Sequence, residues 1–215
     1  MKKINQKFLA DTLNKMYPNA KTELNYNTEF QLLCAVMWSA QTTDKQVNKA
    51  TNQFFDDYKI PEDAIKIWLK NLTKNISTLW FYKTKAKNTY KTAEILIKQH
   101  NSKVPKNFDD LIALPWVWIK TAKVVLAVLQ NAHYLPVDTH VHRVLNRLWF
   151  VDTKTSEQTD KLAKNMFTKT NLVKLHHTLI LFWRYFCTAR KPKCEENCPF
   201  KNNCKYYKNI INNKK

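Results

Sequence analysis

The sequence predicts an all-α fold. Apolar residues recur at helical spacing in one segment after another, and no stretch shows the convincing alternation of a half-buried strand. Asn, Asp and Pro stand where these segments would begin or end. Hydrophobic residues make up 44% of the 215 residues and aromatic residues 13%, which is enough for a sizeable core. The length accommodates one large domain or two small ones.

The first half of the chain carries four predicted helices. Residues 29–38 are apolar nearly all round, as is typical of a buried helix. Residues 44–58 are amphipathic, with their apolar side chains near one stripe. Pro61 opens the third helix and is followed by two acidic residues, which suit a first turn. Residues 83–98 form the fourth.

The second half continues the helical pattern. Asn107 begins a helix that Pro115 ends, and a short hairpin then leads to a helix over residues 120–130. Asp138 is placed to be the N-cap of the next helix. Residues 172–185 form the last strong helix, and the Lys-, Cys- and Asn-rich tail beyond them has few apolar residues. We find no linker, repeat or low-complexity segment.

The chain is strongly basic. It has 36 Lys and Arg against 17 Asp and Glu, a net charge of +19. A surplus of this size favours a polyanionic partner, and nucleic acid above all. The alternative is a lysine-rich proteome encoded by an AT-rich genome, since Asn, Ile and Tyr are abundant too.

Glycine is absent, although average usage would give roughly 15 residues in a chain of this length. This excludes a glycine-rich phosphate loop, a dinucleotide-binding fingerprint and a collagen-like repeat. Every left-handed turn must be made by another residue type.

Nothing in the sequence indicates a membrane or a secretory route. No apolar run approaches the roughly 20 residues of a transmembrane helix, and the N-terminus lacks the apolar core of a signal peptide. We therefore expect a cytoplasmic protein.

Four of the five cysteines lie within a short tail, with the spacing C-x6-C-x3-C-x5-C. They are Cys187, Cys194, Cys198 and Cys204, whereas Cys34 falls in a buried helical segment. Cysteines in a short cytosolic tail favour a metal site over disulfides. Only Cys194 and Cys198 have the spacing of a zinc knuckle, and the wide arrangement suits a 4Fe–4S cluster. Spacing alone favours the cluster slightly and leaves zinc open.

Several motifs follow one another along the chain. They are S-A-Q-T-T-D at 39–44, W-F-Y-x-x-K-A at 80–86, L-P-W-V-W-I-K-T-A at 114–122, V-D-T-H-V-H-R at 137–143 and the R-Y-x-C-x-A-R-K-P-x-C segment of the cysteine tail. Together they resemble the motifs of the endonuclease III family, which are helix-hairpin-helix DNA glycosylases with AP-lyase activity. The resemblance runs roughly from Thr22 to Cys204.

This resemblance implies two helical domains with a DNA cleft between them. Residues 22–132 would form a six-helix barrel domain that includes the helix-hairpin-helix. Residues 1–21 and 133–215 would form a helical domain with the 4Fe–4S loop. The implied partner is double-stranded DNA with damaged or abasic sites. The protein would be a monomer in the bacterial cytoplasm, associated with the nucleoid.

By the same resemblance, Lys120 is the catalytic nucleophile and Asp138 the catalytic carboxylate. A flipped-out nucleotide exposes C1′, and a neutral lysine amine attacks it to form a Schiff base. The carboxylate would stabilise the positive charge that develops at C1′. In isolation, Lys120 would be read as a solvated lysine at a helix start, and Asp138 as a plain N-cap.

The implied DNA contacts divide into two sets. Gln41 corresponds to the residue that fills the space left by the flipped nucleotide, and Phe81 to a hydrophobic wedge. Without the resemblance these would be a helix-end amide and a core aromatic residue. The remaining predicted contacts are Trp116, Val117, Trp118, Thr121, His140, Arg143, Lys191 and Lys193. His140 and His142 more readily make local hydrogen bonds or phosphate contacts than take part in catalysis.

The sequence departs from the family pattern at two places. One extra residue separates Cys194 from Cys198. Trp116 and Trp118 occupy both glycine positions of the family hairpin L-P-G-V-G, where glycine permits a positive φ and a close approach to phosphate. Trp80, Trp149 and Trp183 fall at other family glycine positions, which suggests a gene that reads UGA as glycine. Trp38 and Trp68 are less clear.

Other functions remain open at this level. A family relative acting on mismatched thymine or adenine is one. A DNA- or RNA-binding protein without catalysis is another, which Trp116 and Trp118 would favour. The third is a redox-sensing DNA-binding protein built on the cluster.

Overall fold

The computed structural model describes residues 4–167 and 171–212, and all regular structure within these ranges is helical. The chain divides into two compact units, a terminal unit of Met1–Thr22 and His133–Lys215 and a central unit of Glu23–Ala132. None of the described helices is both long and apolar enough to cross a membrane.

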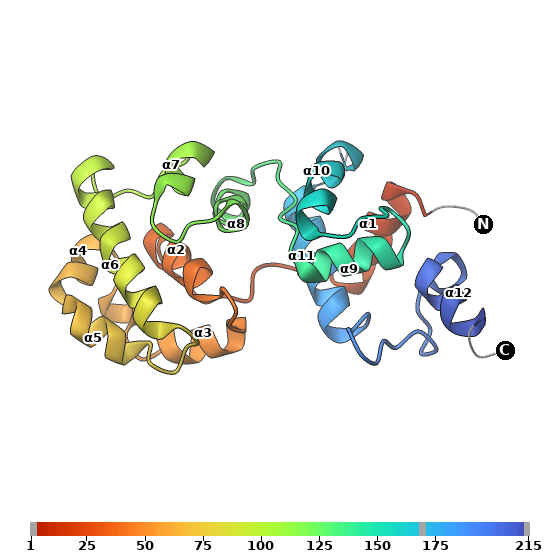
Figure 1. Ribbon diagram of the computed structural model, residues 1–215, viewed down its shortest axis with the longest axis horizontal. Coiled ribbons are helices and arrows are strands. Elements are labelled where there is room, and N and C mark those ends of the chain that lie inside the picture. The colour runs from red at the N-terminus through yellow and green to blue at the C-terminus, as the bar shows by residue number, and fades with distance from the viewer. Residues whose placement is uncertain (1–3, 168–170, 213–215) are drawn as a thin grey trace. The chain divides into compact units, whose positions relative to one another are not determined.

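The central unit contains seven α-helical segments (Figure 1). They are α2 (Glu29–Trp38), α3 (Asp44–Thr51), α4 (Pro61–Lys66), α5 (Trp68–Asn75), α6 (Tyr82–Gln99), α7 (Phe108–Ala113) and α8 (Ile119–Gln130). Helix α2 contacts α3, α6 and α8, while α4 and α5 pack on α6. Every residue from Phe30 to Trp38 is buried, as the apolar sequence of α2 predicts.

Two helices of this unit are shorter than the sequence pattern suggests. Helix α3 ends at Thr51. Phe55, which was expected on the same helix, is buried but belongs to a separate 3₁₀ turn (Phe55–Asp57). The helix that starts at Pro61 ends at Lys66, and α5 starts at Trp68, whose φ is +62°. This left-handed residue explains why the unit has seven helical segments where the resemblance implies six.

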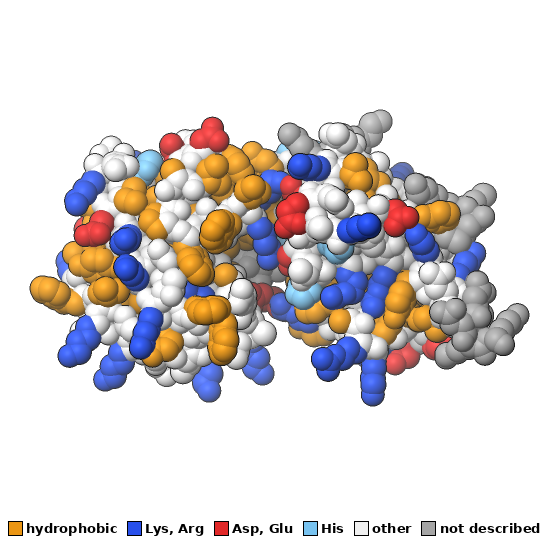
Figure 2. All heavy atoms as spheres, viewed as in Figure 1, with side chains coloured by type: hydrophobic (Ala, Val, Ile, Leu, Met, Phe, Trp, Pro, Cys, Tyr) orange, Lys and Arg blue, Asp and Glu red, His pale blue; other side chains and the backbone are white. Residues whose placement is uncertain are grey.

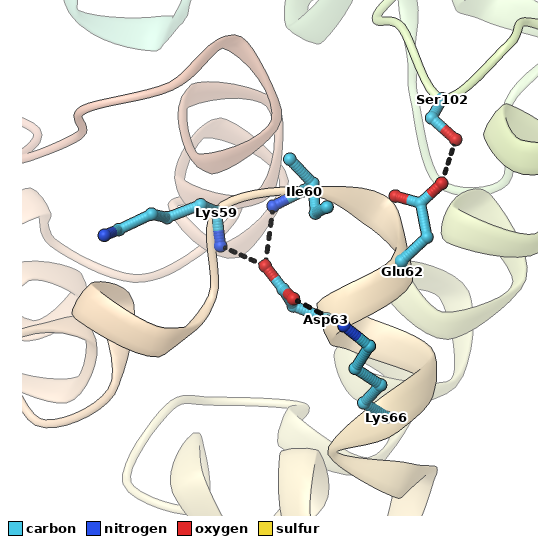
Figure 3. Close-up of polar contacts among 6 residues, drawn as sticks. All are labelled: Lys59, Ile60, Glu62, Asp63, Lys66 and Ser102. Carbon is cyan, nitrogen blue, oxygen red and sulfur yellow. Dashed lines mark hydrogen bonds and ion pairs between the residues drawn. The ribbon is translucent and has the colours of Figure 1, made fainter.

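The start of α4 shows how acidic residues fix a helix end (Figure 3). Asp63 Oδ2 accepts the backbone N–H groups of Lys59 (2.9 Å) and Ile60 (3.0 Å), and Asp63 also pairs with Lys66. Ser102 donates a hydrogen bond to Glu62 from the loop after α6. The acidic first turn is therefore confirmed, and it ties α4 to the end of α6.

The described part of the terminal unit contains five α-helices. They are α1 (Gln6–Met16), α9 (Thr139–Arg147), α10 (Ser156–Met166), α11 (Leu172–Tyr185) and α12 (Lys205–Asn212). Helices α1 and α9 pack on α11, and α10 and α12 pack on α9 (Figure 1). The bounds of α11 confirm the last strong helix. The sequence pattern did not single out α10 or α12.

Candidate active site

The turn between α7 and α8 is short, and a backbone hydrogen bond and a buried side chain stabilise it. The Val117 N–H donates to the Leu114 carbonyl over 3.2 Å, and the Val117 side chain is buried. Trp116 has φ +64°, so the turn requires one left-handed residue. Trp118 is the N-cap of α8, and no side chain caps this helix end. The first N–H groups of a helix have no intrahelical partners, so this end of α8 offers donors to an anion.

Lys120 is the second residue of α8 and is exposed. It therefore lies in the first turn of a 12-residue helix, at the positive end of the helix dipole. Thr121, the next residue, is buried and anchors the first turn in the central unit.

The two hairpin tryptophans have different backbones. Trp118 is extended, with φ −85° and ψ 169°, so the expectation that both positions need glycine is wrong for Trp118. Trp116 is left-handed, and its buried indole Nε1 has no hydrogen-bond partner. The two rings lie edge to face with centroids 6.4 Å apart. The strain is therefore confined to Trp116.

Three of the seven tryptophans are left-handed. Trp68, Trp116 and Trp149 have φ values of +62°, +64° and +64°. The left-handed region costs a residue with a β-carbon roughly 1–2 kcal/mol. Trp80 and Trp183 have no positive φ, although the resemblance places both at family glycine positions.

Gln41 and Phe81, the two predicted base-stack residues, share an unusual geometry. Both are exposed and left-handed, with φ +55° at Gln41 and +56° at Phe81. Gln41 lies in the turn between α2 and α3, and Phe81 is the N-cap of α6. The Phe81 side chain is 51% exposed, so it is not a core aromatic residue.

Lys85 is a buried cation that the sequence analysis did not assign. Its side chain is 1% exposed, and its Nζ donates to the Trp38 carbonyl and to Thr42 Oγ1, each at 2.7 Å. Burial lowers the pKa of Lys85 to about 8. The lysine of the W-F-Y-x-x-K-A motif was the available signal, but its helical pattern does not say what an inward-facing lysine would contact.

The lowered pKa of Lys85 makes the free energy of unfolding depend on pH. The folded state releases the proton near pH 8, whereas an unfolded lysine keeps it to about pH 10.4. Between these values the unfolded chain binds more protons, so this group makes the protein more stable as pH rises. We expect the free energy of urea unfolding of the native chain, minus that of Lys85→Met, to increase between about pH 7 and about pH 9.5. A constant difference would contradict the lowered pKa.

Asp138 is the N-cap of α9, as the sequence predicts. Its Oδ1 accepts the backbone N–H groups of His140 and Val141, each at 2.9 Å, and the side chain is half-buried. The ring of His140 stacks on Trp183 with centroids 3.4 Å apart. His142 Nδ1 lies 2.6 Å from Thr159 Oγ1, which is the local hydrogen bonding expected of this residue.

The four tail cysteines line one small apolar cavity of about 10 Å³ in the terminal unit, and all four are free thiols. Burial raises the pKa of Cys194, Cys198 (to about 11) and Cys204, and the neighbouring cysteine sulfurs raise these pKa values further. None of the described cysteines forms a disulfide. Within residues 4–167 and 171–212, no three His, Cys, Asp or Glu side chains are spaced to hold a single metal ion.

Arg147 supports the cysteine loop, a role that the sequence analysis missed. Its guanidinium donates to the carbonyls of Cys187, Thr188 and Ala189 over 2.7–3.1 Å. It also lies 3.4 Å from Cys187 Sγ and stacks over the ring of Tyr206. Arg147 ends α9, 40 residues before Cys187, so its place in the sequence gave no sign of this contact.

The predicted phosphate contacts of the terminal unit are accessible. Arg143 is half-buried on α9 and Lys191 is exposed in the cysteine loop. Lys193 pairs with Glu196 at 3.6 Å, which offsets part of its charge. Figure 2 shows Lys and Arg side chains scattered over the displayed face of both units.

Comparison with known proteins gives consistent matches. Residues 34–169 match the model of the HhH-GPD superfamily of base excision DNA repair proteins. Endonuclease III of Rickettsia conorii is 42% identical over 202 residues, which are 94% of this chain and 96% of that protein. A non-covalent endonuclease III–DNA complex superposes with a TM-score of 0.89 at 36% identity, covering 96% of each chain. A trapped covalent endonuclease III–DNA intermediate also gives 0.89, at 37% identity and 95% and 96% coverage.

The fold and the site therefore define a base excision DNA repair protein of the HhH-GPD superfamily. Within that superfamily, the chain belongs to the endonuclease III family. It is a DNA glycosylase with AP-lyase activity.

Proposed function

We propose that this enzyme removes oxidised pyrimidines from double-stranded DNA and cleaves the resulting abasic sites by β-elimination through Lys120. The observation that carries the proposal is the position of Lys120, an exposed lysine in the first turn of α8 directly after a strained hairpin turn. The family to which the chain belongs and the motif around Lys120 support the proposal that this residue is the nucleophile.

The reaction starts when the damaged nucleotide leaves the stack. The neutral Lys120 amine attacks C1′, the C1′–N bond to the base breaks, and the base takes a proton as it leaves. The lysine nitrogen then forms a double bond to C1′ as the C1′–O4′ bond of the sugar ring breaks and O4′ takes a proton. The resulting Schiff base acidifies the C2′ proton. Loss of that proton expels the 3′ phosphate, and water releases the lysine.

Asp138 supplies a negative charge and is held in place by two backbone N–H groups. In the proposed reaction its carboxylate stabilises the positive charge at C1′ and assists proton transfer. A carboxylate fixed by capping loses little orientation when the transition state forms.

Variants of Asp138 separate capping from catalysis. Asp138→Asn keeps an oxygen that accepts from His140 and Val141, so we expect stability within a few tenths of a kcal/mol of the native chain. Asp138→Ala removes the cap and should cost about 1 kcal/mol. Both variants should slow base release by roughly 10²–10⁴-fold, measured by single-turnover kinetics with urea unfolding alongside. Full activity in Asp138→Asn would reduce this residue to a helix cap.

DNA binding is supported by the net charge of +19 and by the uncapped N-terminus of α8. We propose that backbone N–H groups in the first turn of α8, which includes Thr121 and directly follows the turn at Val117, bind a phosphate, as helix N-termini do. Trp116 and Trp118 flank that position. His140, Arg143, Lys191 and Lys193 would add sequence-independent phosphate contacts.

Gln41 and Phe81 are proposed to enter the base stack. Both stand on left-handed turns of the central unit and are exposed. An apolar wedge unstacks a base step, and the amide fills the vacated space.

Cys187, Cys194, Cys198 and Cys204 are proposed to hold a 4Fe–4S cluster. Their thiols share one apolar cavity, which suits four sulfur donors shielded from water. A four-iron cube takes one cysteine per iron, so it needs wider sulfur spacing than a single zinc ion does. When bound, the cluster cross-links the loop and supplies folding energy to it. Arg147 orders the same loop from α9.

A panel of duplexes tests the lesion class. Each duplex carries one oxidised pyrimidine, one mismatched thymine, one adenine opposite an oxidised guanine, or one abasic site. The proposal expects release of the oxidised pyrimidine and β-elimination products from it and from the abasic duplex. Preferential release of mismatched thymine or adenine would show that the enzyme has a different base specificity from the one proposed. Binding without cleavage of any duplex would contradict the lyase assignment.

A further inference from the structure

Lys85 connects the two turns that carry Gln41 and Phe81. Its side-chain ammonium donates to the Trp38 carbonyl and to Thr42 Oγ1, both at 2.7 Å. Its own backbone N–H donates to the Phe81 carbonyl over 3.0 Å. One residue of α6 is therefore bonded to both turns.

The two hydrogen bonds of the Lys85 ammonium are made to residues on either side of Gln41. Trp38 is the last residue of α2, and its carbonyl is one of those that a helix end leaves unpaired. The Lys85 ammonium donates a hydrogen bond to this carbonyl, and the negative end of the helix dipole stabilises its positive charge. Thr42 Oγ1, the second acceptor, also reaches the Ala40 carbonyl at 3.5 Å. Gln41 is thus held in its left-handed conformation between two residues that Lys85 binds.

A buried cation with neutral partners is costly to keep. Both acceptors of Lys85 are uncharged oxygens, and burial lowers its pKa to about 8. An apolar side chain of similar length would fill the same space without that cost. A groove of about 350 Å³, lined by Gln41, Gln46, Thr78 and Trp80, lies where the two turns meet.

We propose that Lys85 is a positioning residue, which fixes the spacing and the left-handed geometry of Gln41 and Phe81 so that both enter the DNA stack together. This rests on the proposed function, in which these two side chains replace and unstack bases. Residues in costly backbone conformations persist only where the surrounding structure holds them. Lys85 binds the Phe81 carbonyl and the two residues, Trp38 and Thr42, that flank the Gln41 turn.

The test compares Lys85→Met with Lys85→Arg and with Lys87→Met, which removes a charge from an exposed position of the same helix. Extrusion is followed by the fluorescence of 2-aminopurine placed opposite an abasic site. Borohydride trapping is measured on double-stranded and on single-stranded abasic DNA. A single strand has no paired stack for Gln41 and Phe81 to enter, so its trapping rate reports the Schiff-base chemistry without the contribution of these two side chains.

We expect Lys85→Met to lose the fluorescence increase and to trap double-stranded DNA about 10–100-fold more slowly, a range typical of small misplacements. Its trapping of single-stranded DNA should stay within about twofold, Lys85→Arg should recover part of the loss, and Lys87→Met should match the native chain. Equal slowing on both substrates, or normal fluorescence, would overturn the proposal. Absence of trapping by the native chain would instead overturn the proposed function.

Should Lys85→Met fail to fold, Thr42→Val provides the same test. It removes one acceptor of the ammonium and leaves Lys85 in place. The expected result is again a loss confined to double-stranded DNA, and an unchanged ratio of the two trapping rates would count against the positioning role.

From a separate observation, we infer that the chain made in its own cell carries glycine at positions 68, 116 and 149. These three tryptophans have φ near +60°, a region that glycine enters at little cost and tryptophan does not. The chain has no glycine anywhere. A gene that uses UGA for glycine and contains no ordinary glycine codon would produce both facts.

Trp38 shows that the inference does not extend to every tryptophan. It is fully buried, its Nε1 donates to Thr89 Oγ1 at 2.9 Å, and its ring packs against Phe54, Phe55 and Tyr58. A glycine here would leave a large cavity in the core.

Peptide mass spectrometry of protein purified from the source cells decides the matter. Peptides spanning positions 68, 116 and 149 should each be lighter by the difference between tryptophan and glycine, and the peptide with Trp38 should have the tryptophan mass. Tryptophan at any of the three positions, or glycine at 38, would overturn the inference.

Discussion

Replacing Lys120 by alanine is expected to reduce strand cleavage at abasic sites by roughly 10⁴-fold or more, the scale of losing a covalent nucleophile. The side chain is exposed at the second position of α8, so its removal leaves no cavity. The loss should therefore come without a change in the free energy of unfolding beyond about 0.5 kcal/mol. Single-turnover cleavage and urea unfolding of the same preparation measure the two effects.

Lys120→Arg is the matched control for charge. Arginine keeps the positive charge beside the DNA but stays protonated, so it cannot act as the nucleophile. Binding of abasic DNA should be retained while cleavage is lost. Substantial cleavage by either variant would assign the Schiff base to another of the chain's lysines.

Replacing Trp116 by glycine is expected to increase both stability and DNA affinity. The φ of +64° disfavours any residue with a β-carbon by roughly 1–2 kcal/mol, and the indole Nε1 is buried without a partner. Removal of the indole also exposes the start of α8 to a phosphate. We expect about tenfold tighter binding of double-stranded DNA, the worth of one good charge-assisted hydrogen bond. Fluorescence anisotropy at fixed salt measures the affinity.

The comparison of glycine with alanine at one position isolates the backbone effect, because both remove the indole. Trp116→Gly should be more stable than Trp116→Ala by about 1 kcal/mol. At Trp118, where the backbone is extended, glycine should be no more stable than alanine. If the two positions respond alike, the left-handed turn at Trp116 is not the source of the effect.

Much of the fold follows from local sequence signals. The apolar run of α2, the Pro-Glu-Asp start of α4 and the Asp138 cap of α9 each have a strong physical cause, and all three are confirmed. The division of α4 from α5 was not predicted, because it depends on the left-handed backbone at Trp68 and not on a typical helix-breaking residue. Helices α10 and α12 were not predicted either; α12 has only eight residues and directly follows the cysteine loop.

The site was predictable where a motif specifies a side chain and a turn together. The positions of Lys120 and Asp138 on helix starts follow from the sequence, and their roles remain predictions. The roles of Lys85 and Arg147 were not predictable, because their partners, which are backbone carbonyls and the Thr42 hydroxyl, lie 40 or more residues away in the sequence. Sequence also could not separate Trp116 from Trp118, since only the backbone geometry distinguishes them.

Borohydride trapping tests most directly whether Lys120 forms the Schiff base with DNA. The intact protein is incubated with a double-stranded DNA that carries one abasic site, reduced, and the adduct is digested and sequenced by mass spectrometry. If Lys120 is the nucleophile, a covalent protein–DNA adduct forms at Lys120, and the Lys120→Ala variant forms no adduct. No adduct with the intact protein, or an adduct on another lysine, would contradict it.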